Sequence, residues 1–346
     1  MNSFSAVLSK VNALPINVGW QLETIAEKRG RQELFTRQSP EQLARLREYA
    51  MVESAVASNR IEGVEVDGDR VGTIVFGNGI MKDRDEEEVR GYRKALDLIH
   101  TASDTLKLST ETICRFHALS RPSIWDSGKF RTKDCEIIQT YEDGSSRVRF
   151  KAVSPQAVVS ELERTIEAYE NTIMDRRIPP LVALAAFNLD FLCIHPFNDG
   201  NGRMSRLLTL LLLYRQGYIV GKYISIEMLV EKSKETYYES LKASSDGWDI
   251  NRNDLMPFMR YMLGTILKAY RESSERVEGL IVTGSGKAAR IRKLFETHLG
   301  ALSKSQIAAE CPDISIAMIE KTLKELLDAG FIVKRGGGRS TSYYRV

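Results

Sequence analysis

Residues 195–206 read His195-Pro196-Phe197-Asn198-Asp199-Gly200-Asn201-Gly202-Arg203-Met204-Ser205-Arg206 and lie between two apolar segments, 180–194 and 205–214. A proline disfavours the α region for the residue before it, so the sequence predicts that the first helix ends at His195. The glycines and the asparagine that follow tolerate a positive φ and let successive backbone N–H groups point inward. The stretch therefore predicts an anion-binding loop at the N-terminus of the second helix, where the helix dipole also favours negative charge.

The side chains of this stretch suit a polyphosphate and a proton transfer. Arg203 and Arg206 are three residues apart, so they share one face of the predicted helix and can both reach phosphate oxygens. Asp199 is a hard oxygen ligand suited to a magnesium ion that bridges phosphates. His195 can take a proton near neutral pH. Each feature alone is usually structural, but their combination in one short stretch indicates a functional site.

The order of these residues resembles the signature of the Fic family, His-Pro-Phe-x-Asp/Glu-Gly-Asn-Gly-Arg-x-x-Arg, and every specified position is present. The resemblance implies a mainly α fold, a Fic-type helical bundle with a β-hairpin flap. It implies transfer of AMP from ATP to a Ser, Thr or Tyr hydroxyl of a protein, the chain itself included. By this resemblance His195 is the general base and Asp199 holds Mg²⁺ or Mn²⁺. The residues expected to bind ATP are Phe197, Asn198, Asp199, Gly200, Asn201, Gly202, Arg203, Arg206, Tyr237 and Tyr238, the two tyrosines because the family's corresponding segment borders the adenosine site.

A second motif ends an earlier predicted helix, about 40–63. Ser39-Pro40-Glu41-Gln42 is typical of a helix start and Gly63 of a helix end. Ser58 and Glu62 are four residues apart and therefore share one face. With Gly63 they are similar to the Ser/Thr-x-x-x-Glu-Gly/Asn inhibitory motif of one Fic class. In that class the Glu pairs with the second signature Arg, here Arg206, and blocks the γ-phosphate. The alternative is an ordinary solvated helix end.

A hairpin is predicted at about 135–150, in an otherwise helical chain. Two β-prone runs flank a turn at Asp143-Gly144. Its place before the signature resembles the flap of the Fic family, which implies that a target protein docks there by main-chain pairing. The alternative is a surface hairpin without function. The segment 64–79, rich in Gly and Asp, is expected to be a loop.

Composition and cysteine usage favour a soluble cytoplasmic protein. Hydrophobic residues make up 43% and charged residues 27% of the chain, which is typical of a globular protein with a core. The net charge of +3 is too small to indicate nucleic acid or membrane binding. The cysteines, at 114, 135, 193 and 311, are scattered and fit reduced thiols. Residues 1–21 lack the pattern of a signal peptide, and no apolar stretch is long enough to span a bilayer.

The length of 346 residues predicts two or three domains. We expect an N-terminal arm at 1–38, the Fic domain at 39–270, a linker at 271–287 and a separate domain at 288–346. In the last part, predicted helices at 288–299, at 303–310 and after Ser315 precede a hairpin. This order resembles a winged helix-turn-helix domain.

The C-terminal residues carry the positive charge of the chain. Residues 287–346 hold 11 Lys and Arg against 6 Asp and Glu, a net of +5. Lys334, Arg335 and Arg339 could hold phosphates. The third predicted helix, however, begins with residues that are poor readers of base edges, Ile316, Ala317, Met318 and Lys321. A DNA partner and a protein partner at 288–346 therefore both stay open.

Three functions are compatible with the sequence. The first is an autoinhibited protein adenylyltransferase, which intact His195 favours because a pure nucleotide sensor needs no base. The second is a DNA-binding regulator whose Fic-like domain senses nucleotide. The third is a de-adenylylating enzyme in which Glu62 positions water. The target protein, its modified side chain and the oligomeric state are left open, a homodimer being one option.

Overall fold

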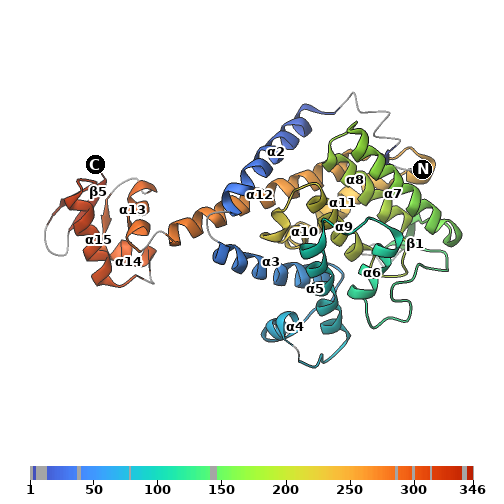
Figure 1. Cartoon of the computed structure of the whole chain (residues 1–346), viewed down its shortest axis with the longest axis horizontal. Coiled ribbons are helices and arrows are strands. Elements are labelled where there is room, and N and C mark those ends of the chain that lie inside the picture. Colours follow the sequence, from blue (N-terminus) through green and yellow to red (C-terminus); the bar gives the residue numbers. More distant parts are fainter. Residues whose placement is uncertain are drawn as a thin grey trace. The chain divides into compact units, whose positions relative to one another are not determined.

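The structure is a computed structural model that describes residues 3–4, 14–36, 40–77, 79–140, 146–284, 287–297, 301–311, 314–336 and 341–345. The chain divides into two compact units, Met1–Ser273 and Ser274–Val346. The larger unit is mainly helical, which confirms the fold class that the sequence predicted (Figure 1).

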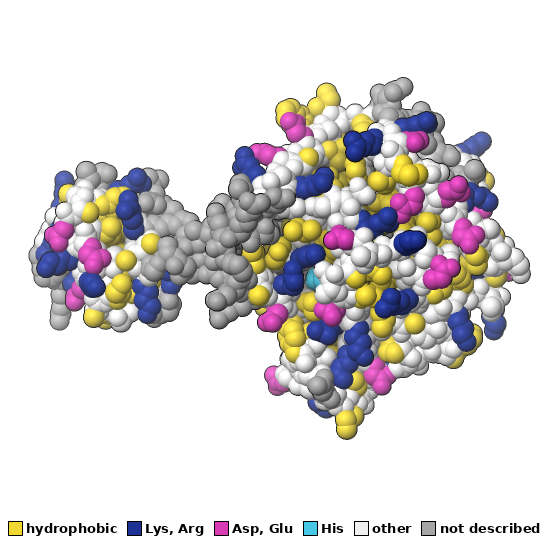
Figure 2. All heavy atoms as spheres, in the orientation of Figure 1, with side chains coloured by type: hydrophobic (Ala, Val, Ile, Leu, Met, Phe, Trp, Pro, Cys, Tyr) yellow, Lys and Arg dark blue, Asp and Glu magenta, His cyan; other side chains and the backbone are white. Residues whose placement is uncertain are grey.

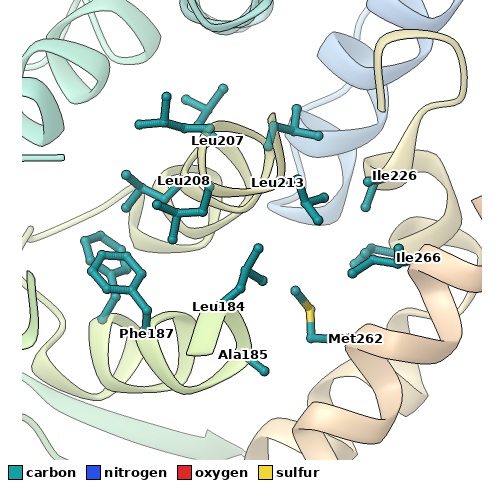
Figure 3. Close-up of a cluster of buried hydrophobic side chains, with 14 of the residues drawn as sticks. Leu184, Ala185, Phe187, Leu207, Leu208, Leu213, Ile226, Met262 and Ile266 are labelled. Carbon is teal, nitrogen blue, oxygen red and sulfur yellow. The ribbon is translucent and has the colours of Figure 1, made fainter. Parts of the chain in front are cut away.

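Two helices on either side of the signature form the centre of the larger unit. They are α8, Pro180–Ile194, and α9, Asn201–Arg215, and almost every side chain of both is buried. Their leucines and phenylalanines interdigitate with side chains from α10 and α12, and Figure 3 shows Leu184, Phe187, Leu208 and Met262 converging in this core. A helix that is apolar on all sides must be surrounded by other elements. The burial of α8 and α9 therefore holds the C-terminus of α8 and the N-terminus of α9 in place on either side of the signature.

The central pair is enclosed by a ring of further helices. Helix α3 packs on α5 and α10, α5 on α6, and α7 on α8 (Figure 1). The bounds are α3 Pro40–Ile61, α5 Arg84–Ala102, α6 Thr110–Ser120, α7 Val158–Asp175, α10 Ile226–Lys232, α11 Lys234–Ser245 and α12 Met256–Gly284. Short 3₁₀ turns lie at η3 Pro155–Ala157, η4 Val220–Lys222 and η5 Trp248–Ile250.

The sequence predicted a loop at 64–79, but the described residues of this segment include helical structure. It contains a 3₁₀ turn, η2 Gly68–Arg70, and a short helix, α4 Val71–Phe76. The side chain of Asp67 caps the turn, and Ile74 and Val75 are buried. The Gly and Asp content favoured a loop. The two buried residues of α4 form too short a pattern to reveal a helical period.

The predicted hairpin is present. Strands β1, Glu136–Thr140, and β2, Ser146–Lys151, pair antiparallel, with an irregularity in register between Ile137 and Ile138. The expected Asp143-Gly144 turn lies outside the described residues. The two strands form a sheet of their own, so each has one edge without a strand partner in that sheet.

The N-terminal segment belongs to the larger unit and packs on its other helices through α2 and Ser3. Helix α2, Ile16–Thr36, buries Val18 and Ile25. The backbone N–H and the hydroxyl of Ser3 both donate to the buried carboxylate of Asp190 on α8, which also accepts from Nε1 of Trp248 at 2.6 Å. Burial raises the pKa of Asp190 to about 6.

The smaller unit has its own core. Its elements are α13 Lys287–Thr297, β3 Leu302–Ser303, α14 Lys304–Glu310, α15 Ile316–Asp328, β4 Ile332–Arg335 and β5 Ser342–Arg345. The strands form one antiparallel sheet in the order β3-β5-β4. Helix α14 begins with a capping box formed by Ser303 and Gln306. Strand β3 was not predicted because two residues carry no alternating pattern. The winged helix-turn-helix assignment stays a prediction.

The segment 271–287, expected to be a linker, is mostly helical. Helix α12 continues through the division at Ser273 as far as Gly284. In the part of the chain that the structure describes, no helix is both long and apolar enough to cross a membrane. Figure 2 shows basic and acidic side chains interspersed over the visible face of the larger unit.

Candidate active site

His195 lies at the end of α8, and one of its ring nitrogens is hydrogen-bonded to the backbone. The helix stops at Ile194, as Pro196 predicted, and His195 takes the left-handed conformation, with a φ of 52° and a ψ of 61°. Its Nδ1 atom lies 3.2 Å from the carbonyl oxygen of Leu192. Because a carbonyl oxygen can only accept, Nδ1 carries the proton, and Nε2 keeps the lone pair that a general base needs.

The surroundings favour the neutral imidazole. Burial lowers the pKa of His195. The positive charge of Arg131 lowers it further, whereas the bond to Leu192 and the charges of Glu62 and Asp199 raise it. The net direction is downward, so the unprotonated form persists at and somewhat below neutral pH.

Phe197, Asn198 and Asn201 shape the loop after His195. The Asn201 side chain accepts from the backbone N–H of Phe197 at 3.0 Å and donates to the carbonyl of Phe197 at 2.8 Å. The Phe197 ring is buried and stacks on His117. Nδ2 of Asn198 donates to Asp126 at 2.6 Å. Contact of these three residues with ATP stays a prediction.

Helix α9 begins at Asn201, ahead of the apolar segment 205–214, and includes both Arg203 and Arg206. Gly200 completes the turn with a φ of 87°, and its carbonyl accepts from the N–H of Met204 at 2.9 Å, so the helix forms at once. Gly202 and Arg203 therefore lie in the first turn. The first N–H groups of a helix have no intrahelical partner, and together with the dipole they attract an anion.

Gly202 lies against the carboxylate of Glu62. A Cβ at position 202 would collide with Oε1 of Glu62 and would lie 3.2 Å from Nη1 of Arg206. The absent side chain thus leaves space for a negatively charged group directly at the N-terminus of α9.

Arg206 is bound by the end of α3. Its Nε donates to Oγ of Ser58 at 2.8 Å, and its Nη2 donates to the Ser58 carbonyl at 2.9 Å and to Oε1 of Glu62 at 2.7 Å. The buried Nη1 has no hydrogen-bond partner among the described residues. Since Nη1 faces Gly202, it is a donor available to an anion there. Gly63 follows with a φ of 82°, as expected of a residue that ends a helix.

Arg203 has a different partner from Arg206. Its Nη1 donates to Oε2 of Glu88 on α5 at 2.6 Å, and both side chains are 3% exposed. The same carboxylate group accepts from Arg84 and pairs with Arg121. Arg203 is thus held by α5 and Arg206 by the end of α3, although both were expected to reach one polyphosphate. Contact of Arg203 with phosphate stays a prediction.

Asp199 is compatible with a divalent cation. Its side chain is 56% exposed, Oδ2 pairs with Arg121, and Oδ1 accepts from the N–H of Gly200 at 2.6 Å. Among the described residues, no cluster of three or more His, Cys, Asp or Glu could hold a metal. Mg²⁺ keeps several waters and usually binds through one or two carboxylates plus substrate phosphates. One exposed carboxylate beside an anion site therefore fits Mg²⁺, whereas it would not fit a metal that requires a protein cage.

The base, the anion site and the carboxylate of Glu62 meet in one pocket. His195, Gly202, Arg206 and Glu62 all line it. Its apolar and aromatic wall is formed by Leu189, Leu192, Cys193, Leu241, Tyr237 and Tyr238. Tyr237 is buried and Tyr238 is 39% exposed. Polar donors and aromatic rings in one pocket suit a nucleotide, and both predicted tyrosines line this pocket.

Several residues that support the site were missed by sequence reasoning. The N–H of Gly128 donates to Nδ1 of His117, so Nε2 of His117 carries a proton and donates to the Asp199 carbonyl at 3.0 Å. Arg121 pairs with Asp199, and Arg131 donates to the His195 carbonyl at 2.7 Å. The four-residue spacing of His117 and Arg121 is the sole trace of this arrangement in the sequence.

Comparison with known proteins identifies relatives of this chain. Residues 107–213 match the Fic/DOC family. The chain is 27% identical over 245 residues to protein adenylyltransferase fic-1 of Caenorhabditis briggsae, covering 69% of this chain and 42% of that protein. It is 28% identical over 151 residues to protein adenylyltransferase Fic of Drosophila persimilis, covering 42% of this chain and 27% of that protein. The chain thus spans less than half the length of these curated relatives.

Solved structures share the fold. A Fic family protein from Desulfovibrio desulfuricans has a TM-score of 0.62 at 23% identity, covering 96% of this chain and 97% of that one. Fic-1, residues 134–508, from Caenorhabditis elegans has a TM-score of 0.58 at 22% identity, covering 81% of this chain and 74% of that one.

Proposed function

Because the chain carries a Fic domain, we propose that it is a protein adenylyltransferase, which transfers AMP from ATP to a hydroxyl side chain of a protein. The observation that supports this most directly is the pocket that brings the Nε2 lone pair of His195 together with the anion site of Gly202 and Arg206. The relatives named as adenylyltransferases support the same activity.

In this reaction the hydroxyl oxygen of the target attacks the α-phosphorus of ATP. The new bond joins that oxygen to phosphorus, and the bond from the α-phosphorus to the oxygen bridging to the β-phosphate breaks. Pyrophosphate leaves with the bonding electrons, and the hydroxyl proton goes to Nε2 of His195. The Nδ1–H bond to Leu192 keeps the imidazole in the required tautomer and orientation.

The phosphates are expected at the N-terminus of α9. The first N–H groups of that helix and Nη1 of Arg206 would hold them. When bound, Mg²⁺ or Mn²⁺ would offset charge on the departing pyrophosphate. Asp199 would hold that ion, exchanging part of its contact with Arg121.

We further propose that Glu62 restrains this activity. Its carboxylate lies where an anion would otherwise approach Gly202 and Arg206, so the γ-phosphate of ATP must compete with it. ATP could still bind with its phosphates turned away from the in-line geometry that transfer requires. Removal of AMP, with Glu62 positioning a water, uses the same residues and is an outcome that the assay below separates.

The target protein is proposed to pair with the β1–β2 hairpin. Each strand has an edge without a strand partner in its sheet, so an extended segment can add to it by main-chain hydrogen bonds. For the smaller unit, a DNA or protein partner at 288–346 stays a proposal. Its exposed Lys334 and Arg335 on β4 would suit phosphates.

The assay compares ATP labelled at the α-phosphate with ATP labelled at the γ-phosphate. The Glu62→Gly chain is incubated with each, alone and with a cell extract as the source of target. We expect label on protein from the α-position and none from the γ-position. Label from the γ-position would indicate a kinase. Loss of AMP from prelabelled protein on incubation with the native chain, which keeps Glu62, would indicate the reverse activity. No label from either, with a salt-dependent gel shift on DNA, would favour the nucleotide-sensing regulator.

A further inference from the structure

Arg131 makes an unusual set of contacts for a residue outside the signature. It is 2% exposed, and among the described residues its guanidinium donates to backbone carbonyls. Nε donates to the His195 carbonyl at 2.7 Å, Nη1 to that of Lys133 at 2.9 Å, and Nη2 to those of Ile194, at 3.2 Å, and Val153. Burying a guanidinium is costly unless its donors are hydrogen-bonded. These carbonyl acceptors therefore fix the position of the Arg131 side chain.

Three contacts of Arg131, two from its side chain and one from its backbone, surround His195. The backbone N–H of Arg131 donates to the Pro196 carbonyl at 2.9 Å, and its side chain donates to the carbonyls of His195 and Ile194. Three successive peptide planes around His195 are therefore held by one residue. This matters because His195 has a left-handed conformation that non-glycine residues rarely adopt. The cation also satisfies carbonyls at the C-terminus of α8, where the dipole favours positive charge.

The remaining contacts reach both legs of the hairpin. Lys133 precedes β1 and Val153 follows β2, and both carbonyls accept from Arg131. Just inside them, the N–H of Ala152 donates to the Cys135 carbonyl at 3.1 Å. The same guanidinium thus connects the loop that carries the base with the start and the end of the hairpin.

We propose that Arg131 is a positioning residue that holds Nε2 of His195 and the β1–β2 hairpin in one fixed geometry, so that a target hydroxyl paired along the hairpin meets the base. The inference rests on the proposed adenylyl transfer. Arg131 does not line the pocket described above, so it acts on the proton transfer and the incoming hydroxyl, and not on ATP binding.

The test uses the full chain with Glu62→Gly, into which Arg131→Lys or Arg131→Gln is introduced. Arg131→Lys keeps the charge but loses the planar set of donors, and Arg131→Gln keeps one donor group without the charge. Arg115→Gln, on the exposed side of α6, is the matched control. Self-labelling from α-labelled ATP gives kcat and the KM for ATP, and the ¹H–¹⁵N spectrum of the imidazoles gives the tautomer of each histidine. With four histidines in the chain, the His195→Ala chain assigns the signal.

We expect both Arg131 variants to lower kcat by about 10- to 100-fold, the loss that a misplaced reacting group produces. The KM for ATP should stay that of the Glu62→Gly chain, and the His195 signal should change from the pure Nδ1–H tautomer to a mixture. A native kcat and a native spectrum in both variants would overturn the proposal. Loss of ATP binding in parallel with kcat would also overturn it, because it would show a general structural role. No labelling in the Glu62→Gly chain itself would instead count against adenylyl transfer, while the tautomer spectrum would still decide whether Arg131 holds His195.

Discussion

Oε1 of Glu62 lies 2.7 Å from Nη2 of Arg206, although 144 residues separate them in the chain. The Arg206 side chain is 5% exposed and that of Glu62 is 24% exposed. The contact joins the residue that follows α3 to the first turns of α9, and both side chains line the pocket. A single carboxylate thus occupies the place beside Gly202 and Arg206 where we propose that an anion binds.

Glu62→Gly should raise transfer by roughly 10- to 100-fold, because a hydrogen bond to a charged group contributes about 1.5–3 kcal/mol and ATP would no longer compete with it. Arg206→Ala should lower transfer, since ATP also needs this residue, and the double variant should resemble Arg206→Ala. The measurement is incorporation of α-labelled ATP. Glu65→Gly, at a nearby exposed glutamate, is the control. If Glu62→Gly incorporates no more label than the native chain, residues 58–63 are an ordinary helix end.

His195→Ala should abolish transfer, with a loss of about 10²- to 10⁴-fold from the missing general base, and should leave ATP affinity nearly unchanged. The imidazole acts on the incoming hydroxyl and not on the nucleotide. Transfer is measured as above in the Glu62→Gly chain, and ATP binding by calorimetry. Near-native turnover would remove His195 from the mechanism.

The rate of transfer should fall on the acidic side of the ordinary histidine pKa of about 6.5. Transfer requires the neutral imidazole, and burial lowers the pKa of His195, so the active form persists to lower pH than for an exposed histidine. The rate should therefore be level above that value and decline only below it. A pH–rate profile of the Glu62→Gly chain at saturating ATP tests this. A decline that begins above neutral pH would contradict the assigned environment.

EDTA should abolish transfer, and added Mg²⁺ or Mn²⁺ should restore it. Asp199→Ala should lower transfer by about 100-fold or more, because a bound metal provides several kcal/mol of charge stabilisation. Asp175→Asn, at an exposed aspartate on the surface, should have no effect. Full activity in EDTA would show that the phosphates are neutralised by protein groups alone.

Glu88→Gln should lower the free energy of unfolding by about 3–5 kcal/mol, because it leaves buried arginines without their counter-charge. Glu88 pairs with Arg203 and Arg121, whose side chains are 3% and 1% exposed. Urea unfolding of the larger unit measures the change, with Glu163→Gln, at an exposed site on α7, as the control. A change equal to that of the control would mean that the arginines find water or other acceptors.

Local chemistry predicted much of the fold and the centre of the site. Pro196 predicted the end of α8 and Gly63 predicted the end of α3, because each signal acts within one helical turn. The apolar segment 205–214 did not show where α9 starts, because the side chain of Asn201 satisfies the backbone of Phe197, a contact that composition does not reveal. The roles of Arg121 and Arg131 could not be predicted, since their partners lie far along the chain and are brought together only by packing.

The contact of Glu62 with Arg206 is made within one chain, and this determines what can disturb it. Its opening is a first-order equilibrium, so the effective concentration of the carboxylate is set by α3 and not by the amount of protein. Dilution of the protein leaves the fraction of chains with the Glu62–Arg206 contact unchanged. A nucleotide that competes for Arg206 always meets the same local concentration of the Glu62 carboxylate. A partner that shifts the end of α3 would change that local concentration itself, and could therefore act as a switch without touching the nucleotide.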